Sequence, residues 1–151
     1  MQKITNERHN MIKILMPIDG SEYAERAVVQ VLDLIKSGAT LEIVLLNVQL
    51  PIDSGHARMF LTHEELENYR QEEALSALAG VRALLDAAQV PYSHHIAVGH
   101  PAEIIVNFAQ ESQVDKIIMG THGRGAMLEV LLGSVANEVS QKATIPVFLI
   151  S

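Results

Sequence analysis

The chain has 151 residues, of which 48% are hydrophobic and 19% charged, and it contains no cysteine. One domain of this length buries roughly 68–70% of its unfolded surface, so it can hold a core without cross-links. The absence of cysteine excludes disulfides, thiolate metal sites and cysteine nucleophiles. The net charge of −7, with no basic stripe along any predicted face, argues against nucleic acid as a partner.

Hydropathy along the chain indicates a protein without a membrane partner. The opening residues, MQKITNERHN, include no apolar signal region, and no run approaches the roughly 18 apolar residues of a membrane span. We therefore expect a cytoplasmic protein, in which residues 1–11 form a loose arm before one domain at 12–151.

The first elements are a strand, a helix and a second strand. Residues 12–18, IKILMPI, form an apolar run that stops at Asp19-Gly20-Ser21, which is typical of a buried strand followed by a turn. Ser21 is placed to cap a helix that continues until Ser37-Gly38. The apolar run from Leu41 to about Val48 predicts the second strand.

Residues 49–61 form a connection that exceeds the median length of about 4–6 residues. Met59 and Phe60, near its end, could close over a ligand or pack on the helix that follows. That helix begins at the capping box Thr62-His63-Glu64-Glu65 and ends before Pro91.

The second half continues the alternation of strands and helices. Strands are predicted at 92–98, 115–119 and 146–150, with helices beginning at Pro101 and at Ser134 between them. Strands that are apolar on both faces and alternate with helices predict an α/β domain, with a single five-stranded parallel sheet covered by helices on both faces.

A glycine-rich segment, GTHGRGAMLEVLLGS, occupies residues 120–134. Such a cluster indicates either a turn with positive φ or a ligand held against the backbone. Ligands of open α/β sheets bind beyond the carboxyl ends of the strands, where Asp19 and Gly120 both stand. Backbone amides and a helix N-terminus could hold a phosphate there, whereas tight turning with Ser134 as a simple N-cap is the alternative.

Neither common phosphate fingerprint fits, since a P-loop needs Lys after its last Gly and the dinucleotide motif needs a small residue near Leu128. The pattern Gly120-x2-Gly123-x9-Gly133-Ser134 instead resembles the nucleotide-binding signature of the universal stress protein family. Residues 14–21, 45–48, 98–101 and 143–147 resemble that family in the same order, so the likeness covers nearly the whole chain. Asn47 departs from it, because histidine is more often expected there, and this departure concerns the packing around the base.

The resemblance implies a Rossmann-like fold of the adenine nucleotide alpha hydrolase type with strand order 3-2-1-4-5. It implies binding of ATP, or of AMP or ADP, with Mg²⁺ as an accompanying ion, and a homodimer built through strand 146–150. The implied site surrounds adenine and ribose with Pro17, Ile18, Asp19, Val48 and Met119, and follows ribose and phosphates with Gly120, Gly123, Arg124, Gly133, Ser134 and Val135. Thr121 and His122 complete the set, although His122 could equally be an exposed loop residue.

Other chemistries are disfavoured by the residue pattern. The seven histidines lack metal-ligand spacing, no serine sits in G-x-S-x-G, and no lysine follows the last strand as a receiver-like phospho-acceptor domain requires. For turnover of ATP, the sequence offers only Asp19, His122, Arg124, Glu129 and Ser134 near the phosphates, which predicts slow hydrolysis or none.

The leading hypothesis is a stress-response regulator whose nucleotide occupancy reports energy state to a protein partner that the sequence does not name. A slow ATPase or nucleotidyl transferase is one alternative. A dimerisation module that needs no nucleotide is another.

Overall fold

The computed structural model describes residues 11–51, 59–123 and 132–151. Strands and helices alternate along the chain as predicted, with element boundaries within a residue or two of those expected. In order they are β1 (Ile12–Pro17), α2 (Glu22–Lys36), β2 (Leu41–Gln49), α4 (His63–Ala87), β3 (Tyr92–Val98), α5 (Pro101–Glu111), β4 (Lys116–Gly120), α6 (Ser134–Lys142) and β5 (Val147–Ile150). All but Met11 of the predicted arm lies outside the described residues.

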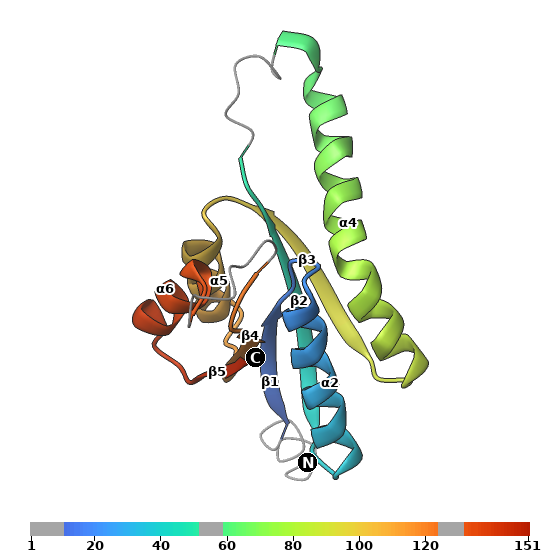
Figure 1. Ribbon diagram of the computed structural model, residues 1–151, viewed down its shortest axis with the longest axis vertical. Coiled ribbons are helices and arrows are strands. Elements are labelled where there is room, and N and C mark those ends of the chain that lie inside the picture. Colours follow the sequence, from blue (N-terminus) through green and yellow to red (C-terminus); the bar gives the residue numbers. More distant parts are fainter. Residues whose placement is uncertain (1–10, 52–58, 124–131) are drawn as a thin grey trace, which may run out of the picture.

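The strands form one parallel sheet in the order β3-β2-β1-β4-β5, which confirms the predicted topology. β1 is central and pairs with β2 on one side and with β4 on the other. The carboxyl ends of β1 and β4 therefore lie next to each other, and the chain leaves them toward opposite faces of the sheet (Figure 1). Such a divergence is where α/β sheets bind ligands.

Each face of the sheet has its own hydrophobic core. On one face, side chains of α2 and α4 such as Val28 and Leu78 pack against Met16 and Leu45. On the other, side chains of α5 and α6 pack against the intervening strand residues, among them Leu15, Leu46 and Ile117. Because successive strand residues point to opposite faces, strands buried on both sides must be apolar throughout, as the sequence is.

The helix starts follow the predicted capping residues at two places. Ser21 accepts a hydrogen bond from the amide of Ala24 at 3.2 Å, and Thr62 accepts one from the amide of Glu65 at 3.1 Å. Helix α4 begins well beyond the edge of the sheet, and only its later turns pack on α2 and the strands (Figure 1).

Candidate functional site

A cavity of about 560 Å³ opens at the carboxyl ends of β1, β2 and β4, on the face that α5 and α6 cover. Each predicted site residue within the described part of the chain lines this cavity, and Arg124 lies outside the described residues. The lining members of the predicted set are Pro17, Ile18, Asp19, Val48, Met119, Gly120, Thr121, His122, Gly123, Gly133, Ser134 and Val135. The topology thus brings together residues that are far apart in the sequence.

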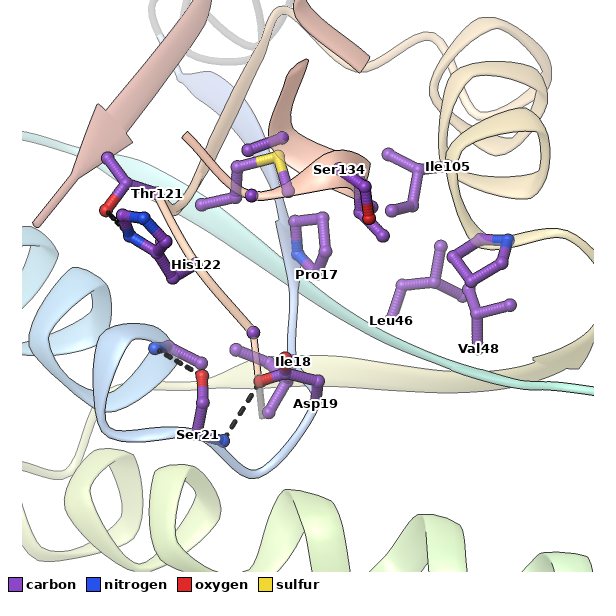
Figure 2. A pocket seen from close by; sticks show the side chains of 18 of the residues that line it. Pro17, Ile18, Asp19, Ser21, Leu46, Val48, Ile105, Thr121, His122 and Ser134 are labelled. Carbon is purple, nitrogen blue, oxygen red and sulfur yellow. Dashed lines mark hydrogen bonds between the residues drawn. The ribbon is translucent and has the colours of Figure 1, made fainter. Parts of the chain in front are cut away.

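The turn after β1 holds the carboxylate of Asp19 at the rim of the cavity. Asp19 Oδ1 accepts a hydrogen bond from the amide of Ser21 at 2.9 Å, at the start of α2 (Figure 2). Gly20 makes the turn with φ of +85°, a value that disfavours any side chain, and an added Cβ would lie 3.2 Å from Ala77 Cα. The backbone that follows Asp19 therefore restrains the position of its carboxylate.

Close packing explains the three described glycines of the cavity. None of them has positive φ. A Cβ on Gly120 would lie 2.6 Å from Tyr23 Cβ, one on Gly123 would lie 2.7 Å from Asp19 Oδ2, and one on Gly133 would lie 3.0 Å from Thr121 O. The sequence pattern predicts a positive-φ turn or a ligand as the reason for these glycines. The structure shows a third reason, the close contact of neighbouring chain segments.

Thr121 joins this glycine-rich segment to two other elements. Its amide donates to Ile150 O at the end of β5 at 2.9 Å, and its carbonyl accepts from the amide of Gly133 at 2.7 Å. The start of α6 is thereby held beside the end of β4.

The N-terminus of α6 faces the cavity without a side-chain cap. Gly133, and not Ser134, is the N-cap, so the interpretation of Ser134 as a simple cap is wrong; Ser134 is the first helical residue and is exposed. The first turn of α6 contains no acidic residue, whereas the first turns of α2, α4 and α5 each contain one or two. Its amides and its partial positive charge are therefore available to an anion.

The side of the cavity formed by β2 and α5 is apolar. Leu46 and Val48 of β2 face Ile105 of α5, across the cavity from Thr121 and His122 (Figure 2). Several lining residues escaped the sequence-based set: Ser21, Ala24, Leu46, Leu50, Pro101, Ile105 and Ala136. Strand alternation could have found Leu46, two residues before Val48, but the residues of α5 required knowledge of how the helices pack.

β2 extends past the end of β1 and leaves backbone groups facing the cavity. Pairing of β1 with β2 ends at Pro17 and Leu46, followed by one bond from the Ile18 amide to Leu46 O at 2.8 Å. Pairing of β2 with β3 continues as far as Gln49, whose carbonyl accepts from Gly99. Because alternate residues direct their backbone groups to opposite neighbours, those of Val48 face the side where β1 has ended.

His122 is packed rather than loosely exposed. Its ring lies 5.1 Å from the ring of Tyr23 at an interplanar angle of 45°, and its Nδ1 is 2.9 Å from the hydroxyl of Thr121. Tyr23 in turn lies under the guanidinium of Arg26, 5.3 Å from the ring centroid. The interpretation of His122 as an exposed loop residue is wrong, because it is half-buried beside the cavity.

Two expectations about neighbouring residues are also corrected. Met59 and Phe60 are 78% and 76% exposed and do not line the cavity. Asn47 does not pack around the cavity, because strand alternation turns it to the opposite face from Leu46 and Val48.

Titratable groups that could hold a metal are sparse in the described part of the chain. No group of three or more histidine or carboxylate side chains lies close enough there to bind an ion, and among the described lining residues Asp19 is the one carboxylate. No helix of the described segments combines the length and the apolar character needed to cross a bilayer.

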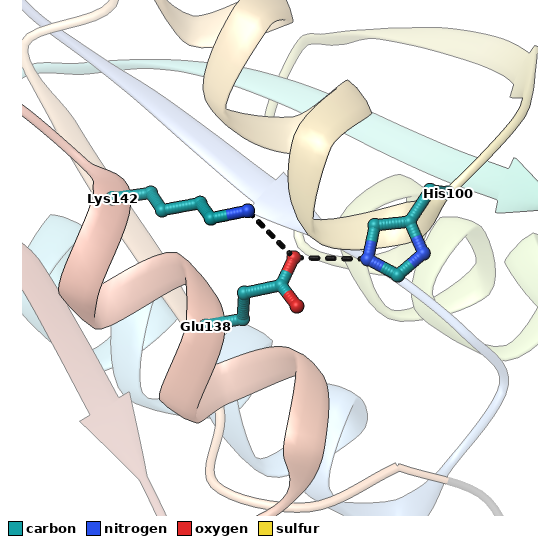
Figure 3. Close-up of polar contacts among 3 residues, drawn as sticks. All are labelled: His100, Glu138 and Lys142. Atoms are coloured by element: carbon teal, nitrogen blue, oxygen red, sulfur yellow. Dashed lines mark hydrogen bonds and ion pairs between the residues drawn. The ribbon is translucent and has the colours of Figure 1, made fainter.

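A polar cluster ties together the two helices that frame the cavity. His100, the N-cap of α5, makes a 2.9 Å contact through Nε2 with Glu138 Oε2 on α6, and Lys142 Nζ lies 3.4 Å from the same oxygen (Figure 3). The hydrogen bond with His100 lowers the pKa of Glu138 below its ordinary value of 4.5, and the charge of Lys142 adds to this effect.

The Glu138→Gln variant is expected to lose a stabilising contribution that depends on pH. Because the pKa of Glu138 is lower in the folded than in the unfolded chain, its carboxylate stabilises the fold above about pH 4.5, and this is lost as pH falls through the lowered pKa. The variant should melt slightly below the parent protein at pH 7, and the difference should shrink toward pH 3. Melting curves across this range measure it, with Glu111→Gln at the other end of α5 as the control; a difference independent of pH would contradict the assignment.

Comparison with known proteins identifies relatives whose similarity extends over nearly the whole chain. The sequence model of the universal stress protein family matches residues 11–151. Universal stress protein MJ0577 of Methanocaldococcus jannaschii is 35% identical over 158 residues, which cover 91% of this chain and 93% of the relative. The solved structure of MJ0577 superposes with a TM-score of 0.77 at 36% identity, covering 92% of this chain and 94% of that one.

Two more distant structures of the same fold contain nucleotides. The universal stress protein of Archaeoglobus fulgidus, solved in complex with dAMP, has a TM-score of 0.60 at 24% identity and covers 93% of this chain and 98% of its own. A universal stress protein family member of Arabidopsis thaliana, solved with AMP bound, has a TM-score of 0.66 at 20% identity and covers 92% and 90%. Together, the family match and the close relative show that this chain belongs to the universal stress protein family.

Proposed function

We propose that the cavity binds an adenine nucleotide, ATP or its products AMP and ADP, and that nucleotide occupancy is what this stress protein signals. The observation that carries the proposal is the cavity itself, which places an apolar slot on one side and the uncapped start of α6 on another. Its volume of about 560 Å³ lies within the 300–1,000 Å³ of small-molecule sites.

The apolar side suits a planar base. Leu46, Val48, Pro101 and Ile105 offer aliphatic surface from two elements, and the backbone of Val48 offers one donor and one acceptor beside them. An adenine edge presents both a donor and an acceptor, so this backbone can read it without a side chain. Asp19, at the rim, can accept a hydrogen bond from a ribose hydroxyl, the role that acidic residues play in other nucleotide folds.

The other side suits phosphates. Gly133, Ser134 and Val135 present the first amides of α6, and a helix N-terminus contributes roughly 0.3–1 kcal/mol toward an anion. Gly120, Thr121 and Gly123 bring further backbone to the same region, and Arg124 is proposed to add a positive charge. The overall charge of −7 opposes binding weakly, because charges beyond about 8 Å are screened at physiological salt.

Binding is proposed to proceed with slow hydrolysis or none. Asp19 and His122 are the ionisable side chains among the described lining residues, and His122 is engaged with Tyr23 and Thr121. Efficient phosphoryl transfer also recruits a fixed lysine or a second acid for metal, and neither is among those lining residues. Mg²⁺ would then be held mainly by the phosphates.

The regulator is proposed to be a cytoplasmic homodimer joined through strand β5. Within the described chain β5 pairs with β4 alone, which leaves its outer edge open, and Phe148 is 47% exposed. An apolar edge strand of this kind is normally covered. A second copy would cover it, and a further regulatory protein is proposed to read the occupied state.

Native mass spectrometry of the protein purified without added nucleotide tests both parts of the proposal. We expect a species near twice 16.6 kDa that carries ATP, AMP or ADP, and we expect added ATP to restore full occupancy after dialysis. Dimers that neither carry nor take up nucleotide would favour the dimerisation module. Release of products at the 1–100 s⁻¹ typical of kinases would favour the enzyme.

A further inference from the structure

Asn47 is a polar side chain that the cavity does not explain. It is 2% exposed and lies near the end of β2, on the face of the sheet opposite the cavity. We propose that Asn47 is a positioning residue of the nucleotide site, which acts from behind the sheet through Ile18 and Asp19. The inference rests on the proposed function, and it names a residue that touches no nucleotide.

The amide of Asn47 is oriented by two hydrogen bonds. Its Nδ2 donates to Ile18 O at 2.8 Å, and its Oδ1 accepts from Gln49 Nε2 at 2.7 Å. Because the oxygen is taken by Gln49, the amide cannot reverse without losing both bonds. Gln49 therefore keeps the donor of Asn47 directed at Ile18.

The hydrogen bond from Asn47 restrains the backbone at Ile18, where the sheet binds the amide but not the carbonyl. The amide of Ile18 donates to Leu46 O at 2.8 Å, but β1 has already ended at Pro17, so no strand among the described residues supplies a donor for the carbonyl of Ile18. Asn47 supplies it. Since the peptide group is planar, fixing the carbonyl of Ile18 also fixes the amide and the Cα of Asp19.

The position of Asp19 then sets the rim of the cavity. Its carboxylate accepts from the amide of Ser21 (Figure 2). The backbone of Gly123 packs so closely that a Cβ there would lie 2.7 Å from Asp19 Oδ2. Displacement of the peptide before Asp19 moves the group proposed to bind ribose and the loop that packs on it. The side chain of Asn47 therefore controls the site from the other face.

Histidine at position 47, which the family resemblance favours, is compatible with the same role. Its Nδ1 is separated from Cβ by the same number of bonds as Nδ2 of asparagine, so a protonated Nδ1 can donate to Ile18 O. The positioning role therefore requires a hydrogen-bond donor at the δ position, which both asparagine and histidine provide.

The test compares Asn47→Leu, which removes the donor and keeps the number and branching of the side-chain heavy atoms, with Asn47→His, which keeps a donor at the δ position. ATP affinity is measured by calorimetry well below the melting temperature, in the parent protein and in the Asp19→Ala background. We expect Asn47→Leu to weaken ATP binding about tenfold, the equivalent of one buried hydrogen bond, and Asn47→His to stay within about threefold. In the Asp19→Ala background, Asn47→Leu should add little.

A merely structural role predicts a different pattern. Asn47→Leu would then lower the melting temperature while leaving the affinity unchanged, or its effect on affinity would add in full to that of Asp19→Ala; either result overturns the inference. Gln49→Leu is the milder second variant if Asn47→Leu does not fold. It should weaken ATP binding about threefold with Asn47 present and not at all in the Asn47→His protein.

A measurement without nucleotide separates this inference from the proposed function. Hydrogen exchange of the Ser21 amide, which is bonded to Asp19, should accelerate about tenfold in Asn47→Leu and about threefold in Gln49→Leu. The amide of Glu65, bonded to Thr62 at the cap of α4, should be unchanged and serves as the control. If ATP does not bind at all, the proposed function fails, but the exchange rate of the Ser21 amide still tests whether Asn47 positions Asp19. An unchanged exchange rate at Ser21 overturns the inference.

Discussion

Gly120→Ala is expected to lower the free energy of unfolding by about 1–3 kcal/mol or more, the cost of overpacking a core. The added Cβ would lie 2.6 Å from Tyr23 Cβ and 2.9 Å from the backbone carbon of Tyr23. No rotamer change can relieve this contact, so β4 or α2 must shift as a whole. For a chain of this size each kcal/mol corresponds to about 2–4 °C, and calorimetric melting of the variant measures the loss.

Gly80→Ala is the matched control for this prediction. Its Cβ would meet Glu25 Oε1 at 2.5 Å, a distance as short as that at Gly120. That atom ends a flexible, exposed side chain that can rotate away, and alanine is favoured over glycine within a helix by about 0.8–1.0 kcal/mol. We expect an equal or higher melting temperature, and an equal loss in both variants would show that rigid packing is not the cause.

Gly133→Val and Gly123→Val are expected to abolish the stabilisation that ATP confers while leaving the circular dichroism spectrum native. Valine at 133 would press on Thr121 O and His122 Cα, and valine at 123 would displace the carboxylate of Asp19. At a hundred times the dissociation constant, ATP should stabilise the parent protein by about 2.7 kcal/mol, or roughly 5–10 °C. Thermal melting with and without ATP should show this shift in the parent and none in the variants.

Gly38→Ala separates loss of stability from loss of binding. Gly38 lies in the turn after α2, has φ of +106° and has no atom near an added Cβ, so alanine is strained there without touching the cavity. This variant should melt at a lower temperature than the parent protein, yet ATP should raise its melting temperature by the same amount as in the parent. If ATP raised the melting temperatures of Gly123→Val and Gly133→Val as much as that of the parent protein, the proposed site would be refuted.

Most of the architecture was predictable because local patterns and topology agree. The alternation of apolar strands with capped helices yields the β-α order, and the likeness of the glycine pattern to a known family supplies the strand order 3-2-1-4-5. The predicted site residues converge on one cavity because the ends of parallel strands meet at one edge of the sheet.

Packing decided what the sequence left open. The glycine spacing predicts turn or ligand positions at Gly123 and Gly133, but it does not reveal their contacts with Asp19 and Thr121. Ser134 has the chemistry of an N-cap, yet it is the first helical residue, because Gly133 has the extended backbone of the cap.

The locations of Asn47 and Ile105 relative to the cavity also depend on packing that the sequence pattern did not predict. The position of Asn47 next to Val48 suggested a shared environment, whereas strand alternation places their side chains on opposite faces. Ile105 reaches the cavity only because α5 crosses back over the sheet, an arrangement set by the whole core.

The hydrogen bond from the Thr121 amide to Ile150 O joins the proposed nucleotide site to the strand through which the homodimer is proposed. One peptide unit follows the last residue of β4 beside the proposed phosphates, and the other belongs to the final residue of the outer strand. A ligand that displaced Thr121 would remove the donor bonded to the Ile150 carbonyl, and its binding would then be linked to the geometry of the outer strand.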